Sequence, residues 1–182
     1  MKKGFIQHHS QSGKLGTSKF RRGAGFTLIE LLIVIGIIAI LAAIIFVAVD
    51  PARRIQDARD AERWSSVNSI LNAILKYTVD GNGTLPTTVN SAVNGSYYVI
   101  GTGGSGACDS CADASSPFIT NCRDINNGGN DELVGSYLSA IPIDPNKTDG
   151  VDTGYYFMKS SSGRITIGAC DPERADSIEV SR

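Results

Sequence analysis

A single carboxylate, that of Glu30, lies within a long apolar stretch near the start of this 182-residue chain. It is the only ionisable side chain in the 24 residues from Phe26 to Val49. Placing such a group in a membrane costs about 2.5–3.5 kcal/mol even on lenient insertion scales. Something must offset this cost, so Glu30 is a candidate functional residue.

Four cysteines form the second group of residues that could do chemistry: Cys108, Cys111, Cys122 and Cys170. An even number fits two disulfides, with three possible connectivities. We expect a link from the Cys108–Cys122 loop to Cys170, which would contribute about 2–4 kcal/mol. A redox-active pair of Cys108 and Cys111 is one alternative, although such pairs stand at a helix N-terminus and this one lies in a glycine-rich loop. Zinc binding is another, although a second close CxxC pair is missing.

The sequence lacks the residue sets of the common enzyme sites. Its only histidines, His8 and His9, precede the apolar stretch, so the rest of the chain has no Ser-His-Asp or Cys-His arrangement. It also has no Gly-x-x-x-x-Gly-Lys-Ser/Thr loop for binding nucleotides. We therefore expect a protein that is not an enzyme.

The apolar stretch is long enough to span a membrane. At about 1.5 Å per residue it makes roughly 36 Å of helix, against a hydrocarbon layer of about 30 Å. Residues 1–25 carry six cations and no acid, and positive charge marks the cytoplasmic side of a span. The remaining chain is thus expected outside the cytoplasm, where disulfides form. Without residues 1–25 its formal charge is −7, from eleven basic and eighteen acidic residues, which gives no support for nucleic-acid binding.

The sequence Gly-Phe-Thr-Leu-Ile-Glu at residues 25–30, with the apolar run behind it, resembles the N-terminus of type IV prepilins and type II secretion pseudopilins. The resemblance implies cleavage between Gly25 and Phe26 by a membrane-embedded prepilin peptidase, followed by N-methylation of Phe26. It also implies that Glu30 pairs with the Phe26 amine of a neighbouring subunit in a helical filament. The alternatives are an ordinary signal anchor with a stray glutamate, and a secretory signal peptide, whose apolar region is only about 7–15 residues long.

The same resemblance implies partners and a location. The chain would form a homo-oligomeric filament on an inner-membrane assembly platform with a separate ATPase. Before assembly it would be a single-pass protein of the cytoplasmic membrane, and afterwards part of a surface filament or a periplasmic pseudopilus. The alternative is a minor, filament-tip or membrane-anchored exported protein that binds a partner through its cysteine-rich loop.

Beyond the apolar stretch, the pattern predicts more helix and then a small α+β domain. Asp50-Pro51 kinks or restarts the helix, which an apolar stripe at helical spacing then continues to about Asp80. The stripe consists of Val67, Ile70, Leu71, Ile74 and Leu75. A β-prone run follows at Tyr97–Ile100, and a hairpin is predicted from Tyr155–Met158 and Arg164–Ile167.

We accordingly expect a pilin-like α+β fold, in which a long N-terminal helix packs against a small antiparallel sheet. The expected divisions are a cleaved leader (1–25), a membrane-spanning or filament-core helix (26–49), an exported amphipathic half of that helix (50–80) and a globular domain (81–182).

A second resemblance suggests a metal. The segment Tyr137–Pro145, followed by Gly154–Tyr156, is similar to a stretch of major pseudopilins whose following loop holds calcium. The candidate ligands are carboxylates, which calcium prefers: Asp144, Asp149 and Asp152. The loop also contains a cation, Lys147, and aspartate and asparagine populate turns through local hydrogen bonds. A plain acidic turn without any cofactor is therefore the alternative.

Overall fold

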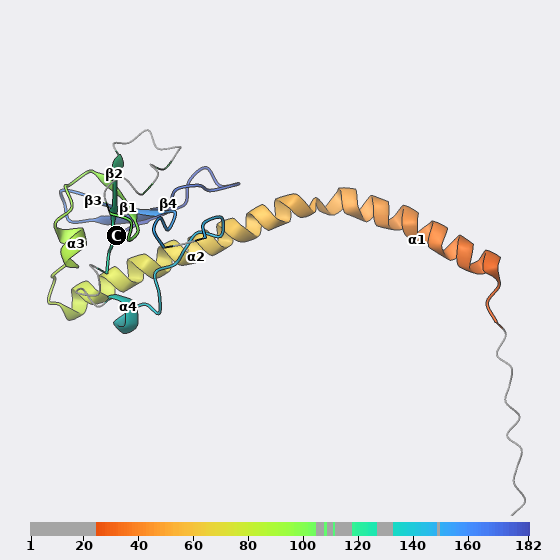
Figure 1. The fold of residues 1–182 in the computed structure, drawn as a ribbon, viewed down its shortest axis with the longest axis horizontal. Helices are drawn as coiled ribbons and strands as arrows, with labels where there is room; N and C mark the ends of the chain where they lie inside the picture. Colours follow the sequence, from red (N-terminus) through yellow and green to blue (C-terminus); the bar gives the residue numbers. More distant parts are fainter. Residues whose placement is uncertain (1–24, 105–107, 109–110, 112–117, 127–132, 149) are drawn as a thin grey trace, which may run out of the picture. The chain divides into compact units, whose positions relative to one another are not determined.

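The computed structural model describes residues 25–104, 108, 111, 118–126, 133–148 and 150–182. Its elements, in chain order, are α1 (Leu28–Val49), α2 (Pro51–Asp80), α3 (Thr87–Asn90), β1 (Tyr97–Ile100), β2 (Phe118–Arg123), α4 (Leu133–Ser136), β3 (Tyr155–Lys159), β4 (Ile165–Ala169) and β5 (Glu179–Ser181) (Figure 1). The chain separates into two compact units after Val47. The first contains most of α1, and the second contains α2 and the whole sheet.

Helix α1 is apolar on every side. None of its 22 residues is buried, and Glu30 is its one charged residue. A helix that is apolar all round needs apolar surroundings, either a protein core or a membrane. By length and composition it is suited to cross a membrane, as the sequence predicts.

The two long helices are separated by Asp50, whose backbone is left-handed with φ 43° and ψ 76°. The Asp50 carboxylate accepts a hydrogen bond from the backbone N–H of Arg53 and so caps α2. Pro51 is the first residue of α2, a position where its fixed φ suits the helix and its missing N–H costs nothing. The chain therefore restarts its helix at Asp50-Pro51, as the proline predicts.

The strands form one sheet in the order β2-β1-β3-β4-β5. Neighbouring strands are antiparallel except β1 and β2, which are parallel. The predicted hairpin is β3–β4, in which Tyr155 pairs with Ala169 at one end and Lys159 pairs with Ile165 at the other. Gly163 in its turn has a φ of 82°, which glycine adopts without strain. The expected α+β fold is confirmed, and the parallel pair is the departure from a purely antiparallel sheet.

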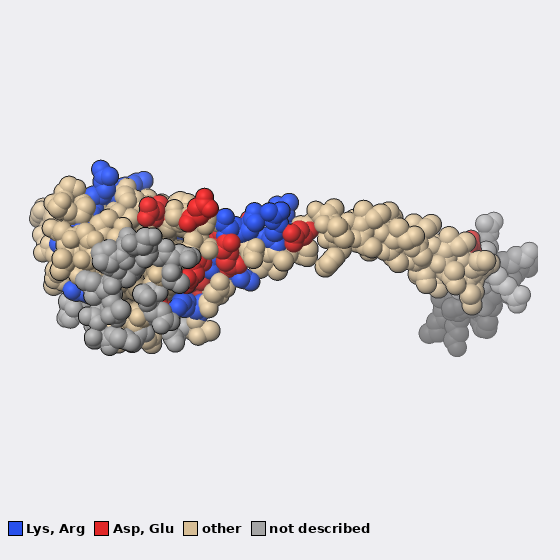
Figure 2. All heavy atoms as spheres, turned by 90° about the horizontal axis from the view of Figure 1, so that it is seen from above, with Lys and Arg blue, Asp and Glu red and all other residues tan. Residues whose placement is uncertain are grey.

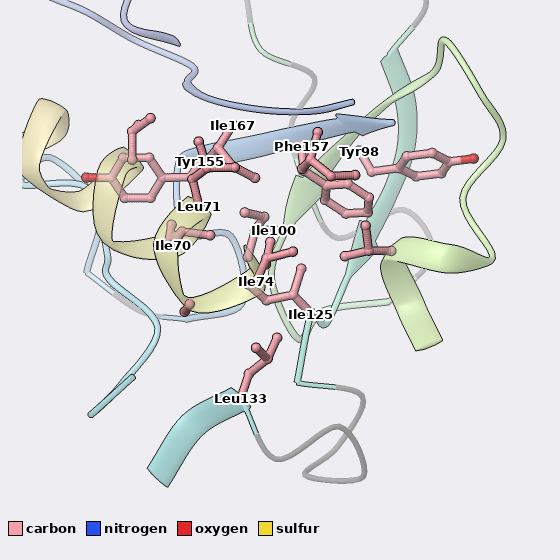
Figure 3. Close-up of a cluster of buried hydrophobic side chains, with 14 of the residues drawn as sticks. Ile70, Leu71, Ile74, Tyr98, Ile100, Ile125, Leu133, Tyr155, Phe157 and Ile167 are labelled. Carbon is pink, nitrogen blue, oxygen red and sulfur yellow. The ribbon is translucent and has the colours of Figure 1, made fainter. Parts of the chain in front are cut away.

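The core lies between α2 and one face of the sheet, as Figure 3 shows. Four residues of the predicted stripe have exposed fractions of 0–1%: Val67, Ile70, Leu71 and Ile74. They pack with side chains from β1, β3 and β4, among them Tyr98, Phe157 and Ile167. Burying each large apolar side chain is worth about 1.5–3 kcal/mol, so this stripe is the main attachment of α2 to the sheet.

Disulfides cover part of the opposite face of the sheet. Cys108 is bonded to Cys122 with a Cα–Cα distance of 5.4 Å, and Cys111 is bonded to Cys170 with a distance of 4.7 Å. All four cysteines pack with Val99 of β1 and Tyr156 of β3. The expected link to Cys170 is thus made from Cys111. Because all four sulfur atoms are bonded to one another in pairs, this state contains no thiolate for zinc or for a redox pair of Cys108 and Cys111.

Candidate assembly site at the start of α1

Thr27 and Glu30 bond reciprocally at the start of α1. The Glu30 carboxylate oxygen Oε2 accepts hydrogen bonds from the Thr27 backbone N–H at 3.1 Å and from the Thr27 hydroxyl at 3.0 Å. The Glu30 backbone N–H donates to Thr27 Oγ1 at 3.2 Å. This arrangement is a capping box, in which two side chains satisfy backbone N–H groups that the first helical turn leaves unpaired. It holds the carboxylate at the N-terminal end of the helix, beside the backbone N–H of Thr27.

One oxygen of this carboxylate remains available. Both capping bonds go to Oε2, and Oε1 makes no hydrogen bond to any residue that the structure describes. The neighbouring Phe26 side chain is 88% exposed. Glu30 can therefore serve its own helix through one oxygen and accept a bond from an external cation through the other.

Thr27 is the hydrogen-bond partner of Glu30, and it is not among the candidate residues named from the sequence. The signal was present, because Ser or Thr followed three residues later by Glu, before an apolar run, predicts a capping box. The pair shows that Glu30 also has a local role, which experiments must separate from any role between subunits.

Packing within the described chain does not require glycine at position 25. A Cβ added to Gly25 would find no atom within 4 Å. Residues 1–24 of the expected leader lie outside the described residues. The glycine therefore has no structural explanation in the fold, which leaves recognition by another protein as the role to test.

The surface of α1 is the largest exposed apolar surface of the described chain. Its large side chains have exposed fractions from 48% at Val49 to 82% at Leu28. Exposed apolar surfaces of this extent mark contact with protein or membrane.

The carboxylates proposed for calcium are engaged by cations of the protein itself. Asp144 is buried and accepts hydrogen bonds from Arg63 Nε at 2.6 Å and Nη2 at 3.0 Å. Asp152 lies 3.0 Å from Lys147 Nζ and accepts a bond from the Gly154 backbone N–H. Asp149 lies outside the described residues. Within the described part of the chain, no three His, Cys, Asp or Glu side chains are grouped to hold a metal, and calcium binding stays a prediction.

Arg63 is the centre of a buried ion-pair network that local sequence patterns do not reveal. It is 0% exposed and bonds to three carboxylates, those of Asp60, Asp144 and Glu173. The hydrogen bonds to Asp144 raise the pKa of the Arg63 guanidinium above its ordinary value. The network joins α2 to two loops that are 81 and 110 residues away in the sequence.

Asp60 fastens the C-terminal loop to α2. Its carboxylate accepts backbone N–H bonds from Glu173 at 2.9 Å, Arg174 at 2.7 Å and Ala175 at 3.0 Å. Burial by itself raises the pKa of the Asp60 carboxyl. The three backbone bonds and the bond from Arg63 outweigh burial and lower this pKa from 3.8 to about 2.

We expect acid to weaken the fold through Asp60. A depressed carboxyl pKa contributes stability above the unfolded-state value, and this contribution is lost as the pH falls from about 4 to about 2. The loss attributable to Asp60 is about 2 kcal/mol. Urea unfolding of the full chain in detergent micelles at several pH values measures it, with Asp60→Asn as control. An equally steep fall in the variant contradicts the assignment to Asp60.

Comparison with known proteins gives one match. No curated protein and no solved structure matches the chain. A family model does match residues 20–46, which include Gly25, Phe26, Thr27 and Glu30. The chain thus carries, at its N-terminus, the prokaryotic N-terminal methylation motif, the signature of type IV pilins and pseudopilins.

Proposed function

We propose that this chain is the precursor of a structural subunit of a type IV pilus or a pseudopilus-like filament. The proposal rests on the methylation motif, which lies on a helix with an exposed apolar surface and a single carboxylate in its first turn. The fold supports it, because α2 is fastened to a small α+β unit while α1 has no buried residue. A structural role also agrees with the lack of enzyme motifs in the sequence.

The proposed assembly contact follows from the geometry of Glu30. Cleavage between Gly25 and Phe26 would create a cationic amine on Phe26. In a filament, the amine of one subunit would donate to Glu30 Oε1 of its neighbour, while Oε2 keeps its bonds to Thr27. Hydrogen bonds to charged groups are worth about 1.5–3 kcal/mol, and the pairing offsets the cost of the carboxylate in apolar surroundings.

The proposed route requires other proteins. A prepilin peptidase would remove residues 1–25 and methylate Phe26. An inner-membrane platform with its own ATPase would move the subunit from the membrane into the filament, where the apolar side chains of α1 would pack against those of neighbouring copies.

Processing is tested by the intact mass and N-terminal sequence of the protein in surface material sheared from its native host. We expect a chain that begins at Phe26 and carries one added methyl group. Gly25→Ser is expected to leave the chain uncut, because we assign Gly25 to recognition by the peptidase, while an added Cβ there meets no atom of the fold within 4 Å.

The matched control for processing is Gly36→Ser, the same change within α1, where an added Cβ also meets nothing within 4 Å. This variant should be cut normally. If Gly25→Ser still yields mature protein, cleavage occurs at a site other than Gly25. An uncut wild-type chain confined to the membrane would overturn the proposed function.

A further inference from the structure

Three arginines from two distant parts of the sequence line one hollow at the start of α2. The hollow has a volume of about 260 Å³ and lies within the unit Ala48–Arg182. Its lining includes Val49, Asp50, Arg53, Arg54, Asp57 and Arg174. Figure 2 shows blue and red side chains gathered on this part of the chain. The volume is below the roughly 300–1,000 Å³ of drug-sized sites and suits a small charged group.

Contacts within the fold fix the position of Arg174. Its backbone N–H donates to Asp60 Oδ2 at 2.7 Å, and Asp60 is in turn held by the fully buried Arg63. Its Nε lies 3.1 Å from Asp57 Oδ1. The buried network thus brings a cation from the C-terminal loop next to Arg53 and Arg54 of α2, where like charges would otherwise separate.

The carboxylates in the hollow do not neutralise these cations fully. Asp57 pairs with Arg174, and Asp50 lies at a longer distance of 4.0 Å from Arg53, with both side chains more than half exposed. Arg54 forms no ion pair with any residue that the structure describes. Three guanidinium groups and two carboxylates leave one surplus positive charge, which matches a phosphodiester with its single negative charge. Guanidinium groups bind phosphate oxygens in a two-pronged geometry that a point charge lacks.

The location favours the phosphate of a membrane lipid. Val49, the last residue of the apolar helix, lines the hollow, and Arg53 and Arg54 follow four and five residues later. That separation is about 6–8 Å along a helix. A bilayer of about 40–45 Å including headgroups, with a hydrocarbon core of about 30 Å, has its polar layer at this distance from the core boundary.

We propose that this hollow binds the headgroup phosphate of an anionic phospholipid while the subunit waits in the membrane. The inference rests on the proposed membrane-anchored precursor. Such a contact would hold the start of α2 at the lipid surface and would be released when the subunit enters a filament. It also gives the positive charge on the exported side of the span a function, since cations there are disfavoured by the usual charge bias of membrane proteins.

The test uses the full chain in lipid nanodiscs that contain phosphatidylglycerol and phosphatidylcholine, with native mass spectrometry to count the lipids retained. We expect wild type to retain phosphatidylglycerol preferentially. Arg53→Gln combined with Arg54→Gln should reduce that preference about thirtyfold, given about 1 kcal/mol for each arginine near a charged surface. The matched control is Arg164→Gln with Arg182→Gln, which removes two exposed arginines outside the hollow.

Each outcome decides something different. No lipid preference in wild type, or equal losses in both double variants, overturns the proposal but leaves the filament function standing. Displacement of the lipid by excess inorganic phosphate would identify a free-phosphate site instead. Failure of the chain to insert into nanodiscs would contradict the membrane-anchored precursor itself.

Discussion

Replacing Arg63 by methionine is expected to lower the free energy of unfolding by about 3–5 kcal/mol. The side chain is fully buried, and its removal leaves the carboxylates of Asp60 and Asp144 in the interior without their cation. Methionine fills a similar volume, so the loss reports the charge rather than a cavity. Urea unfolding of the full chain in detergent micelles, followed by the fluorescence of Trp64 and by near-ultraviolet circular dichroism, measures it.

Arg59→Met is the matched control for Arg63. Arg59 lies one turn earlier on α2, and its side chain is 37% exposed while it pairs with Glu173 at 2.9 Å. Solvent screens such a pair, so its loss should cost at most about 1 kcal/mol. Equal effects of the two substitutions would contradict a special role for the buried arginine. If Arg63→Met does not accumulate, Arg63→Lys keeps the charge but not the forked geometry and should show a smaller loss.

The helices were predictable because their signals are local. An unbroken apolar run predicts α1, a proline after Asp50 predicts the restart, and apolar residues at three- and four-residue spacing predict the buried face of α2. The hairpin β3–β4 was predictable for the same reason, since its strands adjoin one short turn. Each of these features depends on residues that are close in the sequence.

The other features of the fold depend on contacts between residues that are far apart in the sequence. Strand β5 has only three residues, Glu179–Ser181, and exists because it pairs with β4. The parallel pairing of β2 with β1 likewise joins two segments, Tyr97–Ile100 and Phe118–Arg123, that do not adjoin in the sequence. Asp144 is a candidate calcium ligand by sequence, with a plain acidic turn as the alternative, and nothing near it in sequence reveals that Arg63, 81 residues earlier, bonds to both of its oxygens.

For the candidate assembly site, too, part was predictable from the sequence and part was not. The pattern around Gly25 and Glu30 was visible in the sequence, but the hydrogen bonds show that Glu30 has two separable properties. It accepts bonds from Thr27, for which any side-chain oxygen suffices, and it carries a negative charge, which only a partner with a cation uses. A substitution that changes both properties at once, such as Glu30→Ala, cannot distinguish the helix cap from the contact between subunits.

Glu30→Gln separates the two properties and is expected to reduce filament yield about tenfold or more while leaving cleavage at Gly25 intact. Glutamine still completes a capping box with Thr27, so the start of α1 should be preserved. What is lost is the charge-assisted bond to the Phe26 amine of a neighbour, worth about 1.5–3 kcal/mol for each contact. Filament yield is measured in sheared surface material, and the cleaved fraction by intact mass.

Thr27→Ala is the complementary variant, because it removes the cap and keeps the charge. It should cost about 1 kcal/mol of helix stability and leave most of the filament yield, while Thr27→Ser retains the hydroxyl and should behave as wild type. Since a filament repeats the Glu30 contact in every subunit, loss of the charge should affect assembly far more than loss of the cap. Normal filaments from Glu30→Gln, or an equal defect in Thr27→Ala, would confine the role of Glu30 to its own helix.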